Sequence, residues 1–229
     1  MKEAVSEYGA RLAHYNGGTL RNAIPREAEA VVTILSEDKT DFMAAVDEFF
    51  STLRREYGFI EDGLVFKAEE ISLPKTLLPE EIQDDLINAV VACHNGVYRM
   101  IPDAPEVVET SSNLSIVRTS EGLVEIQILV RSSSETMKMA LASELESTFA
   151  LAGARVEFDG AYPGWEPNFK SDILNLMKKI YPQVTGKEAD VKMRHAGLEC
   201  GIIGANYPGL DMISFGPTIK HPHSPNEKV

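Results

Sequence analysis

Residues 107–133, VVETSSNLSIVRTSEGLVEIQILVRSS, carry the clearest strand pattern in the chain. On both sides of Glu121-Gly122, β-branched and apolar residues alternate with polar ones, as is typical of strands that bury one face. A Glu-Gly pair between two such runs indicates a turn. The sequence therefore predicts two paired strands, over 107–120 and 123–133.

The residues after this pair predict a helix and a further strand. Residues 133–153 contain a helical run that begins at serine and ends at Gly153, which are common residues at the two ends of a helix. ARVEFDG, residues 154–160, then predicts a closing strand. The order strand–strand–helix–strand is typical of half of a ferredoxin-like α+β domain.

The same order precedes this block. Strands are predicted over 11–25 and 27–36, with a turn signal at Asn16-Gly17-Gly18, then a helix over 38–58 and a strand over 64–72. Pro79 opens a second helix that reaches Gly96. We therefore predict two duplicated ferredoxin-like halves. Residues 1–8 look like a helix remnant, so the first half is expected to be incomplete and the chain to be part of something longer.

After residue 162 the pattern changes. A helix is predicted over 171–186, and short strands over 190–195 and 210–217. Helices that alternate with short buried strands are typical of α/β structure. The predicted organisation is thus an α+β domain over 1–162 followed by an α/β segment over 163–229.

Composition excludes several classes of function. A formal net charge of −13 opposes binding to nucleic acid, because phosphates would be repelled. No run approaches the roughly 20 apolar residues of a membrane helix, and the N-terminus has no apolar signal segment. The two cysteines, Cys93 and Cys200, do not suggest a disulfide framework, which fits a reducing cytoplasm.

Several motifs resemble one enzyme family. RHAGLECGIIGANYPGLDMISFGPTIKHPHSPNEKV, residues 194–229, resembles the C-terminal catalytic segment of aminoacyl-histidine dipeptidases, which are dinuclear zinc exopeptidases. NGGTLRNAIPREAEA (16–30), VETSSN (108–113) and GAYPGW (160–165) resemble the same family's lid domain. The resemblance implies a lid followed by part of a catalytic domain. It also implies hydrolysis of dipeptides, preferably Xaa-His, by water activated on two Zn²⁺ ions.

The resemblance assigns one metal ligand to this chain. The family pattern Gly-Pro-His-Ser-Pro-(Asp/Asn)-Glu places that ligand at His223, whereas His221 falls where the family usually has glycine. A neutral imidazole on a stiff, proline-bounded loop is a suitable zinc ligand. Without the resemblance, a histidine in such a tail would more simply be a solvated surface residue.

The other catalytic motifs of the family are not in this sequence. They are a His-x-Asp motif, an aspartate and a Glu-Glu pair that includes the general base, all upstream of the lid. The pairs Glu69-Glu70 and Glu80-Glu81 are better explained as solvated faces of lid elements. We therefore expect no catalytic residue here, incomplete zinc binding and an inactive isolated chain.

Three residues are candidates for substrate contact. Asn22 matches a lid asparagine that reaches toward the substrate in relatives, although an asparagine in a turn is otherwise ordinary. His195 and Glu199 occupy the loop that lines the family's substrate pocket, where Glu199 could meet the imidazole of a C-terminal histidine. Cys200 lies near His195, but a buried structural cysteine is a better explanation than a thiol protease.

Two classes of function stay open. The first is a cytoplasmic zinc dipeptidase acting on dipeptide substrates. The alternative is a non-catalytic lid module for self-association or substrate capture, since exposed edge strands can pair across a two-fold axis into a homodimer. Finding His-x-Asp and Glu-Glu ahead of Met1 in the reading frame would favour the first class.

Overall fold

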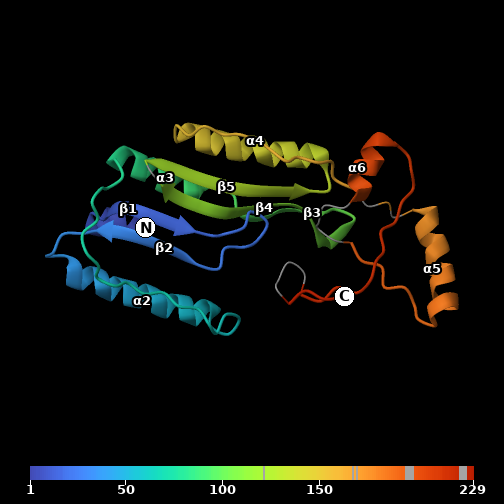
Figure 1. The fold of residues 1–229 in the computed structure, drawn as a ribbon, viewed down its shortest axis with the longest axis horizontal. Helices are drawn as coiled ribbons and strands as arrows, with labels where there is room; N and C mark the ends of the chain where they lie inside the picture. Colours follow the sequence, from blue (N-terminus) through green and yellow to red (C-terminus); the bar gives the residue numbers. More distant parts are fainter. Residues whose placement is uncertain (121, 167, 169, 194–198, 222–225) are drawn as a thin grey trace. The chain divides into compact units, whose positions relative to one another are not determined.

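The computed structural model describes residues 1–120, 122–166, 168, 170–193, 199–221 and 226–229. In chain order, its elements are α1 Lys2–Tyr8, β1 Arg11–Gly17, β2 Ala28–Thr33, α2 Lys39–Tyr57, α3 Glu80–Ala92, β3 Gly96–Ile101, β4 Ala104–Ser120, β5 Leu123–Ser132, α4 Glu135–Leu151, α5 Asp172–Thr185 and α6 Glu199–Asn206 (Figure 1). The architecture is mixed α/β with an antiparallel sheet.

The chain divides into two compact units. The first comprises Met1–Asn95, Asn113–Leu129 and Glu144–Val156, and the second comprises Gly96–Ser112, Val130–Ser143 and Glu157–Val229. The strands β4 and β5 and the helix α4 therefore contribute residues to both units. The predicted boundary between residues 162 and 163 stays a prediction.

The sheet of the first unit is built around β1. This strand pairs antiparallel with β2, from Arg11 opposite Thr33 to Gly17 opposite Ala28, and its last two residues pair with Val117 and Arg118 of β4. The connection from β1 to β2 spans residues 18–27, so the prediction of a turn at Asn16-Gly17-Gly18 was wrong. Gly17 pairs inside the sheet, and the chain leaves the sheet only after it.

A buried glutamine ties α3 to β1. The Gln83 side chain is 0% exposed and its Oε1 accepts a hydrogen bond from the Leu12 amide at 2.6 Å. Its Nε2 donates to the Ala10 carbonyl at 3.4 Å. Buried polar groups are stable in a core only when they are hydrogen-bonded, so this side chain fixes where α3 lies on the strand. The helix begins after Pro79, as predicted.

The segment 64–72 was predicted as a strand and is not one. It runs along α2 instead, because the Phe66 ring packs edge-on against Phe49 at 5.2 Å and Glu70 pairs with Lys39 at 2.6 Å. A residue run with high β propensity becomes a strand only where another strand pairs with its backbone. Figure 1 draws α2 beside β2 in the same unit.

The second unit contains a strand that the sequence did not reveal. β3 pairs antiparallel with the first half of β4, from Gly96 opposite Ser112 to Ile101 opposite Ala104. Its first four residues are exposed, so apolar and polar positions do not alternate clearly. The pattern that identifies a half-buried strand is therefore weak here.

The predicted strands over 154–160, 190–195 and 210–217 are also wrong wherever the structure describes their residues. The helices α5 and α6 are present in this part of the second unit. The two duplicated ferredoxin-like halves and the α/β arrangement after residue 162 are consequently not confirmed. The buried apolar side chains of the described residues all lie between Ala10 and Phe149.

Candidate functional site

The loop that carries Asn22 begins at Gly18, where its backbone lies close to β4. Gly18 has a φ of +76°, and a Cβ atom there would lie 1.8 Å from the Ser115 carbonyl oxygen of β4. The Gly18 amide donates to the Glu27 carbonyl at 3.2 Å, which closes the base of the loop. Only glycine fits both the backbone conformation and the space.

The tip of the same loop is held by Asn113. Its Nδ2 donates to the Ala23 carbonyl at 2.8 Å and to the Arg21 carbonyl at 3.4 Å, so it bonds on both sides of Asn22. Asn22 is exposed, and its side chain has no hydrogen-bond partner among the described residues. Asn113 is the last residue of the VETSSN motif, but no local pattern in the sequence marks it as a contact of this loop.

The other predicted site residues are placed only in part. Glu199 is the first residue of α6, in the second unit, and its side chain is exposed. His195 and His223 lie outside the described residues, so their predicted roles stay predictions. His221 is exposed, and its φ of +52° lies in the left-handed region that favours glycine. That backbone matches the family's usual residue at this position.

The segment that contains GAYPGW lies close to α6 at one glycine and close to the end of β5 at another. A Cβ atom at Gly201 of α6 would lie 2.4 Å from the Pro163 carbonyl oxygen, and one at Gly164 would lie 2.7 Å from the carbonyl oxygens of Ser132 and Ser133. Such short distances leave no room for a side chain. Glycine at these two places lets α6 and the end of β5 approach the segment closely.

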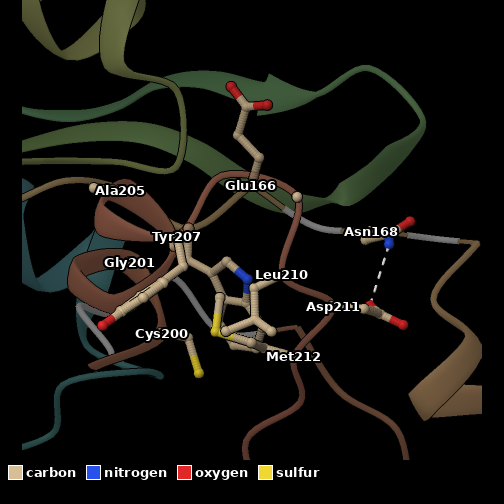
Figure 2. A pocket seen from close by; sticks show the side chains of 13 residues that line it. Glu166, Asn168, Cys200, Gly201, Ala205, Tyr207, Leu210, Asp211 and Met212 are labelled. Carbon is tan, nitrogen blue, oxygen red and sulfur yellow. Dashed lines mark hydrogen bonds between the residues drawn. The ribbon is translucent and has the colours of Figure 1, made fainter.

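A cleft of about 400 Å³ lies beside this segment in the second unit. Residues from the 164–168 segment, from α6 and from the 207–212 segment line it (Figure 2). Cys200 is one of them and is partly exposed, so the expectation that it is buried was wrong. Figure 2 shows the Glu166 side chain extending away from Cys200 and Met212.

Asp211, at the edge of this cleft, caps α5. Its carboxylate accepts hydrogen bonds from the Ile173 amide at 3.0 Å and from Asn168 Nδ2 at 3.3 Å. The Ile173 amide and the Ser171 hydroxyl hold the pKa of Asp211 below its ordinary value of 3.8. The Ser171 hydroxyl also accepts a bond from the Leu174 amide at 3.1 Å, so both groups satisfy the first turn of the helix.

This cap predicts a pH dependence of α5. Because the folded pKa of Asp211 is lowered, its stabilisation is complete above 3.8 and is lost as pH falls through the lower folded value. Asp211→Asn should speed hydrogen exchange at the Ile173 amide near pH 7, and the difference from the parent should shrink in acid. Asp190→Asn, which removes an exposed pair with Lys192, is the control and should leave that amide unchanged. Equal Ile173 exchange in parent and Asp211→Asn at pH 7 would contradict the assignment.

The two thiols should differ in reactivity. Burial, followed by the charge of Glu144, raises the pKa of Cys93 to about 11. The thiolate is the reacting species, and only about one Cys93 in a thousand would be in the thiolate form at pH 8, so this thiol should react slowly. We expect a thiol reagent to label Cys200 in the folded chain and Cys93 only on unfolding, with Cys200→Ser removing the fast phase. Fast labelling that survives Cys200→Ser would contradict this.

The side chains of the pairs Glu69-Glu70 and Glu80-Glu81 are exposed, as predicted. Glu70 pairs with Lys39, Glu69 with Lys67, and Glu80 with Arg11 at 3.3 Å. Lys67 and Lys39 hold the pKa values of Glu69 and Glu70 below the ordinary value.

In the part of the chain that the structure describes, no three His, Cys, Asp or Glu side chains form a metal-binding group. Nor, within that part, is any helix long and apolar enough to cross a bilayer.

Comparison with known proteins gives a consistent picture. No protein-family model matches the chain. It is 40% identical over 224 residues to a cytosol non-specific dipeptidase of Escherichia coli (strain K12), a match covering 97% of this chain and 46% of that protein. The crystal structure of the aminoacylhistidine dipeptidase from Vibrio alginolyticus matches with a TM-score of 0.89 and 39% identity, over 97% of this chain and 46% of that one. The chain spans about half the length of each. Over nearly its whole length it is thus similar to two dipeptidases, one of which is named an aminoacylhistidine dipeptidase, and this confirms the resemblance drawn from its motifs.

Proposed function

We propose that this chain is part of a zinc-dependent dipeptidase that hydrolyses dipeptides, preferably Xaa-His, in the cytoplasm. The observation that carries the proposal is the match of 97% of the chain, at about 40% identity, to two proteins named as dipeptidases. One is named as cytosolic and non-specific and the other as acting on aminoacylhistidine. The preference for a C-terminal histidine follows the second name and the motif resemblance.

Each site residue receives a role from its chemistry. Asn22 presents an exposed amide that can both donate to and accept from a peptide group. Glu199 presents an exposed carboxylate at the start of α6 that can accept a hydrogen bond from the imidazole of a C-terminal histidine. His195 would line the same pocket by family resemblance. All three are proposed substrate contacts.

Zinc is the implied cofactor, and the described residues alone do not fit two ions. They contain no group of three or more metal-ligating side chains. His223, outside them, would be one ligand, and a single imidazole cannot hold two Zn²⁺ ions. When bound, zinc would activate the attacking water. The further ligands and the general base would have to come from elsewhere in the complete enzyme.

The proposal extends to the segment after residue 162. The apolar face of α5 is exposed, with Leu176 at 53%, Ile180 at 40% and Val184 at 78%. An amphipathic helix of this kind is stable when its apolar face packs on another element. We propose that 163–229 is part of an α/β catalytic domain, whose sheet covers this face, and that 1–162 is a lid that can form a homodimer.

The isolated chain should have little or no dipeptidase activity. It offers one candidate zinc ligand and no water-activating carboxylate in the family's motif. The purified chain, incubated with Xaa-His dipeptides and zinc, should release no amino acids above background. The complete enzyme should hydrolyse them, lose activity with a chelator and recover it with zinc. Zinc-dependent cleavage by the isolated chain would contradict the first expectation, and a complete enzyme inactive on all dipeptides would contradict the proposed function.

A further inference from the structure

We propose that Asn113 is a positioning residue, which holds Asn22 in the conformation that contacts the substrate. The inference rests on the proposed substrate contact of Asn22. It goes beyond that contact because it assigns a role to a second residue, Asn113, which lies 91 positions further along the chain. All the residues involved belong to the first unit.

The geometry of Asn113 is specific for the residues beside Asn22. The side-chain amide of an asparagine has two N–H donors. Asn113 Nδ2 lies 2.8 Å from the Ala23 carbonyl oxygen and 3.4 Å from that of Arg21. The two carbonyls stand immediately before and after Asn22, so one side chain restrains the backbone on both sides of it.

Two backbone hydrogen bonds also shape this loop. Its base is closed by the Gly18 amide on the Glu27 carbonyl, and a turn is closed by the Ala23 amide on the Leu20 carbonyl at 3.2 Å. Its apolar side chains are not buried, since Leu20 is 56% and Ile24 is 81% exposed. A loop without apolar burial opens locally at low cost. We therefore expect the hydrogen bonds from Asn113 to contribute to the ordering of Asn22.

An ordered Asn22 would help substrate binding in a specific way. A contact made by a mobile side chain loses part of its binding free energy to the ordering of that side chain and its loop. Removing Asn113 should raise KM more than it lowers kcat, because the reacting groups are untouched. Since Asn113 acts through Asn22, its removal should have no further effect once Asn22 is gone.

The first test measures the loop in the 229-residue chain. In Asn113→Ala, hydrogen exchange at the amide of Ala23 should be at least about fivefold faster, as expected for losing neutral hydrogen bonds. Asn95→Ala is the matched control, because Asn95 Oδ1 accepts from the Leu114 amide at 2.8 Å, next to Asn113. That variant should leave the Ala23 amide unchanged. Equal exchange in the parent and Asn113→Ala would overturn the proposal.

The second test is a double-mutant cycle in the complete enzyme with a Xaa-His dipeptide. Asn22→Ala and Asn113→Ala should each lower kcat/KM, the latter by about five- to tenfold. The double variant should be no worse than Asn22→Ala, whereas a merely structural role would give independent, multiplying losses. Asn113→Asp keeps the size of the side chain and removes its N–H donors. It is the second variant, to be used if Asn113→Ala impairs folding, and it should lower kcat/KM by a similar factor.

The outcomes separate the two proposals. If Asn22→Ala lowers kcat/KM and the Asn113 variants do not, or if the losses multiply, the positioning role is wrong and the substrate contact stands. If Asn22→Ala leaves kcat/KM unchanged, the proposed contact of Asn22 is wrong, and the positioning role falls with it.

Discussion

Replacing His223 by alanine in the complete enzyme is expected to abolish dipeptide hydrolysis and to lower the bound zinc, with folding largely retained. Zinc sites of this kind are built from neutral imidazole and carboxylate ligands. Loss of one ligand should weaken zinc binding more than it destabilises the surrounding fold. Even partners that only orient a ligand cost about 10- to 100-fold when they are removed, so a ligand itself should cost at least about 100-fold. The measurements are the hydrolysis rate, the zinc content and the thermal midpoint.

His221→Gly is the matched control in the same loop. The φ of His221 is +52°, a conformation that glycine adopts without strain and that other residues adopt at a cost. The variant should keep both activity and zinc content, and its stability should stay within about 1 kcal/mol of the parent. If the two substitutions lowered zinc content equally, the placement of the metal ligand at His223 would be wrong.

Gly18→Ala should be the most destabilising of the substitutions proposed for the described residues. Its φ of +76° strains any residue with a side chain, by about 1–3 kcal/mol. In addition, its Cβ would lie 1.8 Å from the Ser115 carbonyl oxygen, so β1 and β4 would have to move apart. Overpacking of this kind adds about 1–3 kcal/mol or more. Chemical denaturation of the chain measures the loss in free energy of unfolding.

Gly122→Ala separates the two causes. Gly122 has a similar φ, +81°, but nothing lies within 4 Å of a Cβ atom placed there. It should therefore show only the backbone strain, and Gly18→Ala should be worse by the cost of the contact. Equal losses in free energy of unfolding would mean that the close approach of Ser115 to Gly18 does not contribute to the effect of Gly18→Ala.

Elements with local signals in their own residues could be predicted. The strands around Glu121-Gly122 are present, and Gly122 has the positive φ that the turn requires. The helix α3 begins after Pro79, and Gly153, just after α4, has a φ of +69°. Each of these signals acts through the conformations that one or two residues can adopt, so no distant contact is needed to interpret it.

The predicted strands that failed lacked a partner rather than propensity. Residues 64–72 were predicted as a strand, but they lie along α2, where Lys39 and Phe49 contact their side chains. β3 was missed for the opposite reason, because its exposed residues carry little pattern and β4 alone makes it a strand. Strand pairing joins residues that are distant in sequence, so a single run cannot show whether its partner is present.

The helices α2 to α5, the strands β4 and β5 and the resemblance to aminoacyl-histidine dipeptidases could be predicted from the sequence, because they depend on neighbouring residues and on motifs within it; α6 was not predicted. How the Asn22 loop is held depends on contacts between residues that are distant in the sequence. Gly18 meets Ser115, and Asn113 reaches the carbonyls on both sides of Asn22, and in each case the two residues are at least 90 positions apart in the chain. Such contacts exist because antiparallel pairing brings β1 and β4 together, and the local sequence of neither strand contains the other's position.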